Sequence, residues 1–216
     1  MAEKGSLTVI SGFSGAGKGT VIQALLRQHE EYVESVSVTT RKPRPGEQEG
    51  VSYFFISEDQ FDQMAGNGEL LEYARYVNHG YGTPRAFVEE NIRAGKDVIL
   101  EIEVQGAMQV KEKWKEANLL FIVPPSAREL LKRLKKRGTE SDEEVTRRII
   151  RACDEAKEME QYDYIVVNDD VQKTVEEVHE IIQASKAASQ KQTALIKRLS
   201  RELEELSLSL KKEAGK

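Results

Sequence analysis

GFSGAGKGT occupies residues 12–20, between an apolar run at residues 7–10 and a second apolar stretch at residues 21–26. That order predicts a buried strand, a glycine-rich loop and the first turn of a helix. The glycines can adopt backbone angles closed to other residues, so amide N–H groups can surround a polyphosphate at the positive end of the helix dipole. Lys18 would add a point charge beside the β- and γ-phosphates. The expected phosphate contacts are Gly12, Phe13, Ser14, Gly15, Ala16, Gly17, Lys18, Gly19 and Thr20.

The residue after the lysine departs from the strict form of this pattern. The strict form places Ser or Thr there, where the hydroxyl can bind Mg²⁺. This chain has Gly19 instead and carries its hydroxyl one residue later, at Thr20. The departure weakens a GTPase interpretation more than a nucleotide-kinase interpretation. A glycine turn that only joins strand to helix is the alternative, and the complete order of strand, glycines, lysine and helix argues against it.

The composition predicts a single-domain enzyme. With 216 residues, 39% of them hydrophobic, the chain can form one substantial core with small inserted lobes. Its net charge of −5 is made of mixed charges, which gives no indication of binding to nucleic acid or to a membrane. Cys153 is the single cysteine, so an internal disulfide is excluded, and its helical surroundings predict a small buried side chain. Residues 1–7 hold no apolar signal core and no stretch reaches membrane-spanning length, so we expect a cytoplasmic protein.

Two arginines follow a short strand in the first half of the chain. Residues 36–40 are β-branched and alternating, which predicts a strand. Two prolines and a glycine exclude regular structure in residues 41–47, so Arg41 and Arg44 stand on a stiffened loop. Their guanidinium groups could bind a second phosphate through paired hydrogen bonds. A solvated basic turn is the alternative, and this stretch alone does not decide between them.

The next segments predict a small set of strands and helices. Residues 53–56 read as a strand, residues 58–67 as a helix and residues 70–77 as a second strand that places Glu72 on one face. A turn then follows, in which Thr83 is expected to cap a helix that ends near Gly95.

A pair of glutamates stands out in residues 97–106. Alternation of polar and apolar residues predicts a strand that carries Glu101 and Glu103 on the same side. Carboxylates near the carboxyl end of a strand in an open α/β sheet point into the crevice where ligands bind. Two surface glutamates on an edge strand are the alternative, but the flanking apolar run favours a buried strand.

Arginines also recur on two helices expected around residues 133–150. Arg133 and Arg137 are four residues apart, hence on one face, and Gly138 can end their helix. Ser141 and Glu144 form a capping box that starts a second helix, which carries Arg147, Arg148 and Arg151. Two helices that bring arginines together at a glycine hinge resemble a lid over a polyphosphate. Taken singly, such arginines are more often solvated.

The alternation of strands and helices decides the predicted fold class. Further strands at residues 119–123 and 164–167 precede a last helix from residue 171, so we expect an α/β fold with a parallel sheet wrapped by helices on both faces. Helical patterning continues from residue 184 to residue 212, where it could pack on the body or pair with another subunit. Its apolar residues follow a heptad spacing: Ile196, Leu199, Leu203, Leu206 and Leu210.

Residues 37–47, SVTTRKPRPGE, together with Gly50 and Tyr53, resemble the signature segment of guanylate kinases. The phosphate loop, EIEVQG, RGTE and VND occur in the order found in that family, and the resemblance covers about residues 6–183. Phe13 departs from the family, which often has proline there, and many members carry aspartates where this chain has Glu101 and Glu103.

This resemblance implies a fold and a domain division. The fold would be a P-loop NTPase-type parallel sheet with an inserted GMP-binding lobe at about residues 36–92 and a helical lid at about residues 133–150. Residues 1–183 would form this guanylate kinase-like domain, and residues 184–216 a C-terminal helical extension. That extension could also mediate a homo-oligomer.

The resemblance further implies ATP-dependent phosphoryl transfer to GMP, and to dGMP, with Mg²⁺ as cofactor. The residues implied for GMP are Ser37, Arg41, Arg44, Tyr53, Glu72, Tyr81, Thr83 and Glu103. The residues implied for catalysis are Lys18, Arg41, Arg133, Arg137 and Arg148. Arg137 and Asn168 would join the phosphate loop in binding ATP, while Thr20 directly and Glu101 through water would face the metal.

Two alternative functions fit the same motifs. One is a kinase for another nucleoside monophosphate or a small phosphorylated sugar, since a phosphate loop and a lid can serve many acceptors. The other is a non-catalytic guanylate-kinase-like module that recognises phosphorylated partners with the arginine loop. The intact phosphate loop with Lys18 argues against the second.

Overall fold

β1 (Leu7–Gly12) lies at the centre of a five-stranded sheet with the strand order β2-β7-β1-β8-β9. All pairings in this sheet are parallel, as predicted. The structure, a computed structural model, describes residues 4–76, 78–136 and 141–214. The other strands of this sheet are β2 (Tyr32–Glu34), β7 (Asp97–Glu101), β8 (Asn118–Val123) and β9 (Tyr164–Val167).

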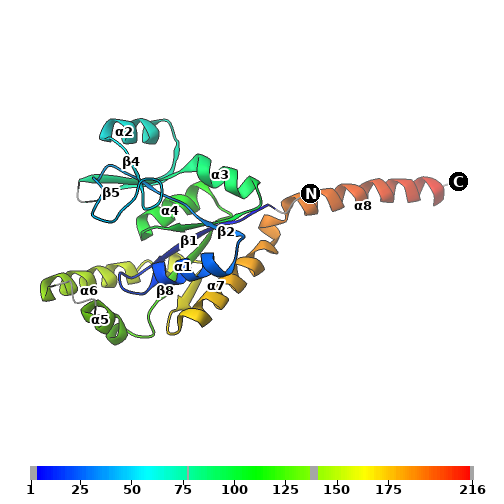
Figure 1. The fold of residues 1–216 in the computed structure, drawn as a ribbon. Helices are drawn as coiled ribbons and strands as arrows, with labels where there is room; N and C mark the ends of the chain where they lie inside the picture. The colour runs from blue at the N-terminus through cyan, green and yellow to red at the C-terminus, as the bar shows by residue number, and fades with distance from the viewer. Residues whose placement is uncertain (1–3, 77, 137–140, 215–216) are drawn as a thin grey trace.

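Helices cover both faces of the sheet, because its inner strands are apolar on both sides. Val9 packs into the core shared with α3 (Arg85–Arg93) and α4 (Val104–Lys113). Its neighbour Ile10 packs on the opposite side, into the core shared with α1 (Lys18–Gln28) and α7 (Val171–Lys186). Figure 1 shows α1 and α7 on one side of β1 and α3 and α4 on the other. The predicted fold class is therefore confirmed.

A second sheet forms the inserted lobe, with the strand order β4-β3-β6-β5. It has its own small core around Val38, Phe61 and Leu70, and it stands apart from the main sheet in Figure 1. The elements of the lobe are β3 (Val38–Thr39), β4 (Phe54–Phe55), α2 (Glu58–Gly66), β5 (Leu70–Tyr76) and β6 (His79–Pro84).

The expected turn at residues 81–84 is wrong, because these residues belong to β6. β6 pairs antiparallel with β5, and the chain reverses near Asn78, which adopts a φ of 63°. Gly82 is needed for close packing: a Cβ there would lie 2.9 Å from Leu70 Cδ1. Thr83 therefore does not cap α3, whose N-cap position is Pro84.

The expected strand over residues 97–106 is also too long. β7 ends at Glu101, and α4 begins at Val104, so Glu103 occupies the N-cap position of a helix. Where the chain leaves the sheet, the Ile102 carbonyl accepts a hydrogen bond from Ser11 Oγ at 2.7 Å. Glu101 and Glu103 consequently do not share a strand face.

The lid helices are present and pack on each other. α5 (Ala127–Lys136) and α6 (Asp142–Ala156) share a core of Leu130, Leu134, Val145 and Ala152. α6 begins with the predicted capping box, in which Ser141 and Glu144 exchange hydrogen bonds. Arg137 and Gly138 lie outside the described residues. A short 3₁₀ turn, η1 (Met159–Gln161), leads on to β9.

The C-terminal helical pattern is broken rather than continuous. α7 ends at Lys186, a 3₁₀ turn η2 (Ser189–Lys191) follows, and α8 (Thr193–Ala214) then extends away from the body (Figure 1). Among the helices of the described ranges, none is both long enough and apolar enough to span a membrane.

Cys153 is exposed, so the expected buried position is wrong. It lies on α6, whose core-facing positions include Val145 and Ala152. Its neighbour Ala152 is buried, so the next residue along the helix turns outward.

Candidate active site

The loop of residues 12–20 has the backbone that its glycines predict. Gly17 has a φ of 95°, and a Cβ there would lie 2.4 Å from Asn168 Nδ2. Gly12 has a φ of 150°, and its Cβ would lie 2.2 Å from the Ile122 carbonyl oxygen. Other residues would be excluded at both positions. Lys18 Nζ donates to the Gly12 carbonyl at 2.7 Å, so the ammonium group lies across the mouth of the loop.

The side chain of Asn168 holds this loop through a hydrogen bond. Its Nδ2 donates to the Ala16 carbonyl at 2.8 Å, and its Oδ1 accepts from Thr174 Oγ1 at 3.3 Å. The residue is 3% exposed. The role beside adenine therefore remains a prediction, and the contacts seen are those of a group that fixes the loop.

Both lid helices place an arginine on the loop. Arg133 donates to the Ala16 carbonyl at 3.3 Å and to the Asn168 carbonyl at 2.9 Å. Arg148 Nη1 donates to Ser14 Oγ at 2.5 Å. The helices thus present positive charge where the amide groups of the loop converge, although they lie far from it in sequence.

A cavity of about 570 Å³ opens between the loop and α6. Arg151 crosses it, since its guanidinium pairs with Glu103 Oε2 at 2.5 Å and lies 5.2 Å from the centroid of the Tyr76 ring. The sequence indicated Arg151 as one of the lid arginines but did not assign it to the site; its spacing from Arg148 along one helix face was the available signal. The lining residues are Gly12, Ser14, Lys18, Tyr76, Glu101, Ile102, Glu103, Val104, Glu144, Arg147, Arg148, Arg151 and Glu155.

A second cavity of about 270 Å³ reaches into the inserted lobe. Four residues line both cavities: Tyr76, Glu101, Ile102 and Glu103. The two cavities are therefore parts of one cleft. The smaller one is completed by Ser37, Tyr53, Glu72, Ala74, Tyr81, Gly82, Gln105 and Gly106.

Glu72 is the buried carboxylate of the smaller cavity, with 5% of the residue exposed. Thr83 Oγ1 donates to Glu72 Oε1 at 2.7 Å, so the hydroxyl orients the carboxylate. Burial raises the pKa of Glu72 above its ordinary value of 4.5, while the Thr83 hydrogen bond and Lys113 act in the opposite direction. The second carboxylate oxygen, Oε2, lies beside Gly106.

Arg41 is held behind this cavity by a network of side chains. Its Nε donates to Tyr81 Oη at 3.2 Å, and its terminal nitrogens donate to both Glu47 carboxylate oxygens at 2.9 Å. The Arg41 guanidinium and the Arg44 backbone N–H lower the pKa of Glu47 to about 2. Tyr53, whose ring centroid lies 5.4 Å from Arg41 Cζ, completes the cluster.

Three of the predicted GMP residues are not among the described residues that line either cavity: Arg41, Arg44 and Thr83. Of these three, Arg44 is the exposed one. Its backbone N–H donates to Glu47 Oε2 at 2.7 Å, which helps to shape the turn. Arg41 therefore packs within the cluster that contains Glu47, Tyr53 and Tyr81, whereas Arg44 lies at the edge of that cluster.

Glu101 stands where the two cavities meet. Partial burial raises the pKa of Glu101, and the charge of Lys18 opposes that shift. A Cβ at Gly19 would lie 3.6 Å from Glu101 Oε2, so the glycine leaves room beside the carboxylate. Thr20 follows in the first turn of α1 and is exposed.

This arrangement is that of a P-loop kinase: a phosphate loop under a basic lid, open to a second pocket that ends in a buried carboxylate. The guanylate kinase family profile matches residues 4–185, and the chain belongs to the guanylate kinase family.

Individual relatives agree with this assignment. The chain is 49% identical over 185 residues to the guanylate kinase of Latilactobacillus sakei, covering 85% of this chain and 91% of that protein. It is 51% identical over 182 residues to the guanylate kinase of Oceanobacillus iheyensis, covering 84% and 88%. The crystal structure of guanylate kinase from Anaplasma phagocytophilum superposes with a TM-score of 0.69 at 34% identity, covering 86% of this chain and 88% of that chain.

Proposed function

We propose that this protein transfers a phosphoryl group from ATP to GMP, and to dGMP, giving the diphosphate and ADP for guanine nucleotide synthesis and recycling. The observation that carries the proposal is the buried Glu72–Thr83 pair in a pocket continuous with the phosphate loop. Guanine offers N1–H and N2–H₂ as adjacent donors, which one carboxylate can accept together. Adenine offers an acceptor at N1, which the carboxylate would repel. Such buried hydrogen bonds can discriminate by roughly 10⁴-fold.

The remaining lobe residues would complete GMP binding. Ser37 and Glu103 line the pocket with Glu72 and would contact the base. Tyr53 and Tyr81 would bind the phosphate together with Arg41, and Arg44 would approach it from the rim. Because the Arg41 fork now contacts Glu47, an incoming phosphate must share or replace that ion pair.

On the ATP side, residues 12–20 would bind the polyphosphate through backbone N–H groups. Lys18, Arg133 and Arg148 contact the loop, which supports the proposal that their charges stabilise the transferring group. Phosphoryl transfer depends mainly on in-line positioning and on cations around the developing charge, so no general base is required. Arg137, outside the described residues, is proposed as a further lid cation, and Asn168 as a support for the loop beside adenine.

The oxygen ligands available near the loop suit Mg²⁺, which prefers a few oxygen ligands supplemented by water and phosphate. Glu101 supplies a carboxylate next to Gly19, and Thr20 supplies a hydroxyl in the first turn of α1. We propose that Glu101 holds the ion through water and that Thr20 takes the place of the hydroxyl missing at residue 19. Bound Mg²⁺ would neutralise charge on the ATP phosphates.

A coupled ADP-release assay with GMP, dGMP, AMP, dTMP and a ribose bisphosphate at matched concentrations tests the function. We expect turnover with GMP and dGMP to exceed that with the others by orders of magnitude. Preference for another acceptor would replace the proposal with the broader kinase interpretation. If calorimetry detected no ATP binding while a phosphopeptide bound, the chain would instead be a binding module. Because the proposed substrates are cytoplasmic metabolites, we also propose the cytoplasm as its compartment, which cell fractionation would test.

We further propose that α8, in the C-terminal extension of residues 184–216, pairs with α8 of a second copy. Its heptad stripe is exposed, with Ile196 47% and Leu203 64% accessible. In an antiparallel register that places Ile196 opposite Leu206, Leu199 falls opposite Leu203. Such a register lets the apolar stripe of one helix bury that of its partner.

Sedimentation of the full chain tests this pairing, with Leu199→Glu/Leu203→Glu as the variant. We expect a concentration-dependent dimer that the double substitution converts to a monomer. Its melting temperature at low concentration should stay unchanged, because both leucines are exposed in one chain. A native chain that remains monomeric at the highest concentrations measured would contradict the proposal.

A further inference from the structure

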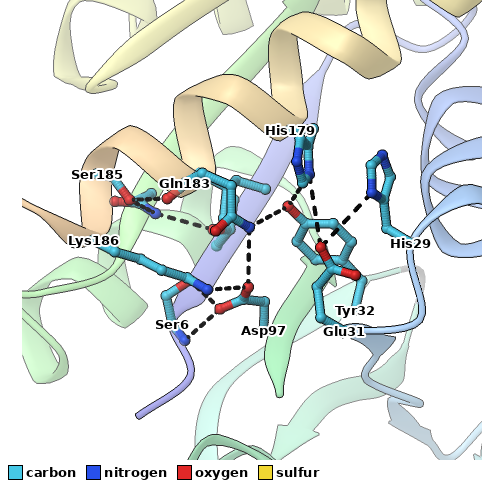
Figure 2. Close-up of polar contacts among 12 residues, drawn as sticks. Ser6, His29, Glu31, Tyr32, Asp97, His179, Gln183, Ser185 and Lys186 are labelled. Atoms are coloured by element: carbon cyan, nitrogen blue, oxygen red, sulfur yellow. Dashed lines mark hydrogen bonds and ion pairs between the residues drawn. The ribbon is translucent and has the colours of Figure 1, made fainter. Parts of the chain in front are cut away.

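Two histidines and a glutamate meet on the face of the sheet that α1 and α7 cover. His29 follows the last turn of α1, Glu31 lies two residues later, and His179 projects from the middle of α7. Figure 2 shows both imidazole rings directed toward the Glu31 carboxylate. Nδ1 of His29 lies 3.7 Å from Glu31 Oε1, and Nδ1 of His179 lies 4.0 Å from the same oxygen. One ligand atom from each residue lies within 4.8 Å of the others.

Neighbouring hydrogen bonds favour one tautomer of His179, in which the Nδ1 lone pair faces the Tyr32 hydroxyl. Gln183 Nε2 donates to Tyr32 Oη at 3.1 Å, and Tyr32 Oη lies 2.8 Å from His179 Nδ1. Since the phenol oxygen already accepts from Gln183, its single hydrogen is available for Nδ1. Nδ1 is then an acceptor, and the proton of the neutral ring resides on Nε2. An unprotonated imidazole nitrogen is the form that binds a metal, and an ion bound at Nδ1 would displace the Tyr32 hydrogen bond.

The imidazole rings of His29 and His179 also stack on each other. The centroids of His29 and His179 are 3.9 Å apart, with an angle of 11° between the planes. Both side chains remain partly accessible, at 26% and 27%. The adjacent Asp97 carboxylate is paired with Lys186 at 2.6 Å, which leaves the Glu31 charge to attract a cation.

We propose that His29, Glu31 and His179 form a site for a first-row transition cation of the Zn²⁺ class. Nitrogen and oxygen ligands lie about 2.0–2.2 Å from Zn²⁺, and so about 3.4 Å from one another in a tetrahedral site. The observed separations of 3.7 and 4.0 Å from each Nδ1 to Glu31 Oε1 must shorten, and the stacked rings must also turn. Rotation of the partly accessible rings out of their stack would turn both lone pairs toward the ion, and water would fill the fourth position.

The site is separate from the catalytic cleft. α1 begins with Lys18 at the phosphate loop, whereas His29 follows its opposite end. Two imidazoles select against Mg²⁺, which prefers oxygen ligands, so the cation of the kinase reaction would not compete strongly. A bound ion would join the end of α1 to α7 and so stabilise that pair of helices.

The test uses the full chain, freed of metal and titrated with Zn²⁺ alone, and with Co²⁺ as an absorbing probe. We expect one ion per chain by calorimetry, tetrahedral Co²⁺ absorption and a melting temperature that rises with Zn²⁺ concentration but not with Mg²⁺. His29→Gln and His179→Gln should each weaken binding by about tenfold or more. Melting temperature without metal, and turnover with ATP and GMP, should stay near native values and show that the variants fold.

Two control variants sharpen the result. Tyr32→Phe removes the hydroxyl that competes for His179 Nδ1 and keeps all three ligands, so binding should be retained or strengthened. Cys153→Ala removes the exposed thiol, which could itself bind Zn²⁺, and should leave binding unchanged. The proposal is overturned if the native chain binds no Zn²⁺ at concentrations of up to about 100 μM. It is equally overturned if binding survives in His179→Gln and is lost in Cys153→Ala.

Discussion

The Glu72 carboxylate occupies the space that a side chain at Gly106 would need: a Cβ there would lie 2.7 Å from Glu72 Oε2. Gly106 is in the first turns of α4, so the helix fixes how closely its backbone approaches the carboxylate. The Thr83 hydroxyl holds the other oxygen, Oε1, at 2.7 Å. The acidic end of the pocket is therefore defined from two sides, by a missing side chain and by a donated hydrogen bond.

Gly106→Ala should weaken GMP binding because the methyl group displaces Glu72. Misplacing a hydrogen bond to a buried charged group costs about 1.5–3 kcal/mol, so the KM for GMP should rise about tenfold to a hundredfold. The KM for ATP should hardly change. A Gly106→Ala enzyme with native KM for GMP would show that Glu72 does not read the base.

Lys18→Ala should lower turnover by about 100-fold or more, as does the loss of one group that stabilises a transition-state anion. The lysine crosses the mouth of the phosphate loop at 2.7 Å from the Gly12 carbonyl, away from the smaller cavity. GMP affinity measured by calorimetry should therefore stay near the native value. If GMP binding collapsed while turnover survived, the two substrate sites would be assigned the wrong way round.

The features of the fold and site that depend on residues close together in the sequence were the ones that could be predicted. The phosphate loop was predictable because three glycines, a lysine and their flanking apolar runs all lie within 20 residues of one another. The position of Glu72 on one face of a strand was predictable from the alternation of polar and apolar residues within that strand. The end of β7 was not predictable, because the alternation continues past Glu101, while the Ile102 carbonyl bonds to Ser11 on a different strand.

Other features were hidden because they depend on distant contacts. β2 has only three residues, too few to show a period, and forms by pairing with β7. Arg151 lies in the cleft where it forms an ion pair with Glu103, a residue on a different element. His29 and His179 are 150 residues apart and meet only because α1 and α7 pack side by side on the sheet. No sequence window contains both members of such pairs.

GMP binding should depend on pH through Glu72, whose pKa is raised above 4.5 by burial. Only the ionised carboxylate accepts both guanine hydrogen bonds, so the KM for GMP should rise as the pH falls through the raised pKa. For folding the sign is opposite: the buried ionised group costs stability, so the free energy of unfolding should increase as the pH falls through the same window.

The GMP phosphate titrates near pH 6 and must be separated from this effect. Glu72→Gln provides the reference, because its remaining pH dependence comes from the phosphate and the other groups. We expect the native enzyme to show the steeper loss of affinity between neutral pH and pH 4.5. Parallel profiles for the two enzymes would mean that the ionisation of Glu72 is not coupled to GMP.

The Asp97–Lys186 ion pair should stabilise the junction between the sheet and the end of α7 (Figure 2). Asp97 has 1% of its side chain accessible and accepts from Lys186 Nζ at 2.6 Å and Ser6 Oγ at 2.8 Å. Asp97→Asn leaves the lysine charge uncompensated and should cost about 3 kcal/mol in urea unfolding. Asp154→Ala, which breaks the exposed pair with Lys157, should change stability by less than about 0.5 kcal/mol.

The double variant Asp97→Asn/Lys186→Met distinguishes a charge effect from a packing effect. Removal of both charges leaves no uncompensated ion, so most of the lost stability should return. Turnover with ATP and GMP should stay native in all these variants, because neither residue lines the cleft. If the double variant were as unstable as Asp97→Asn, the uncompensated lysine charge would not be the cause of the lost stability.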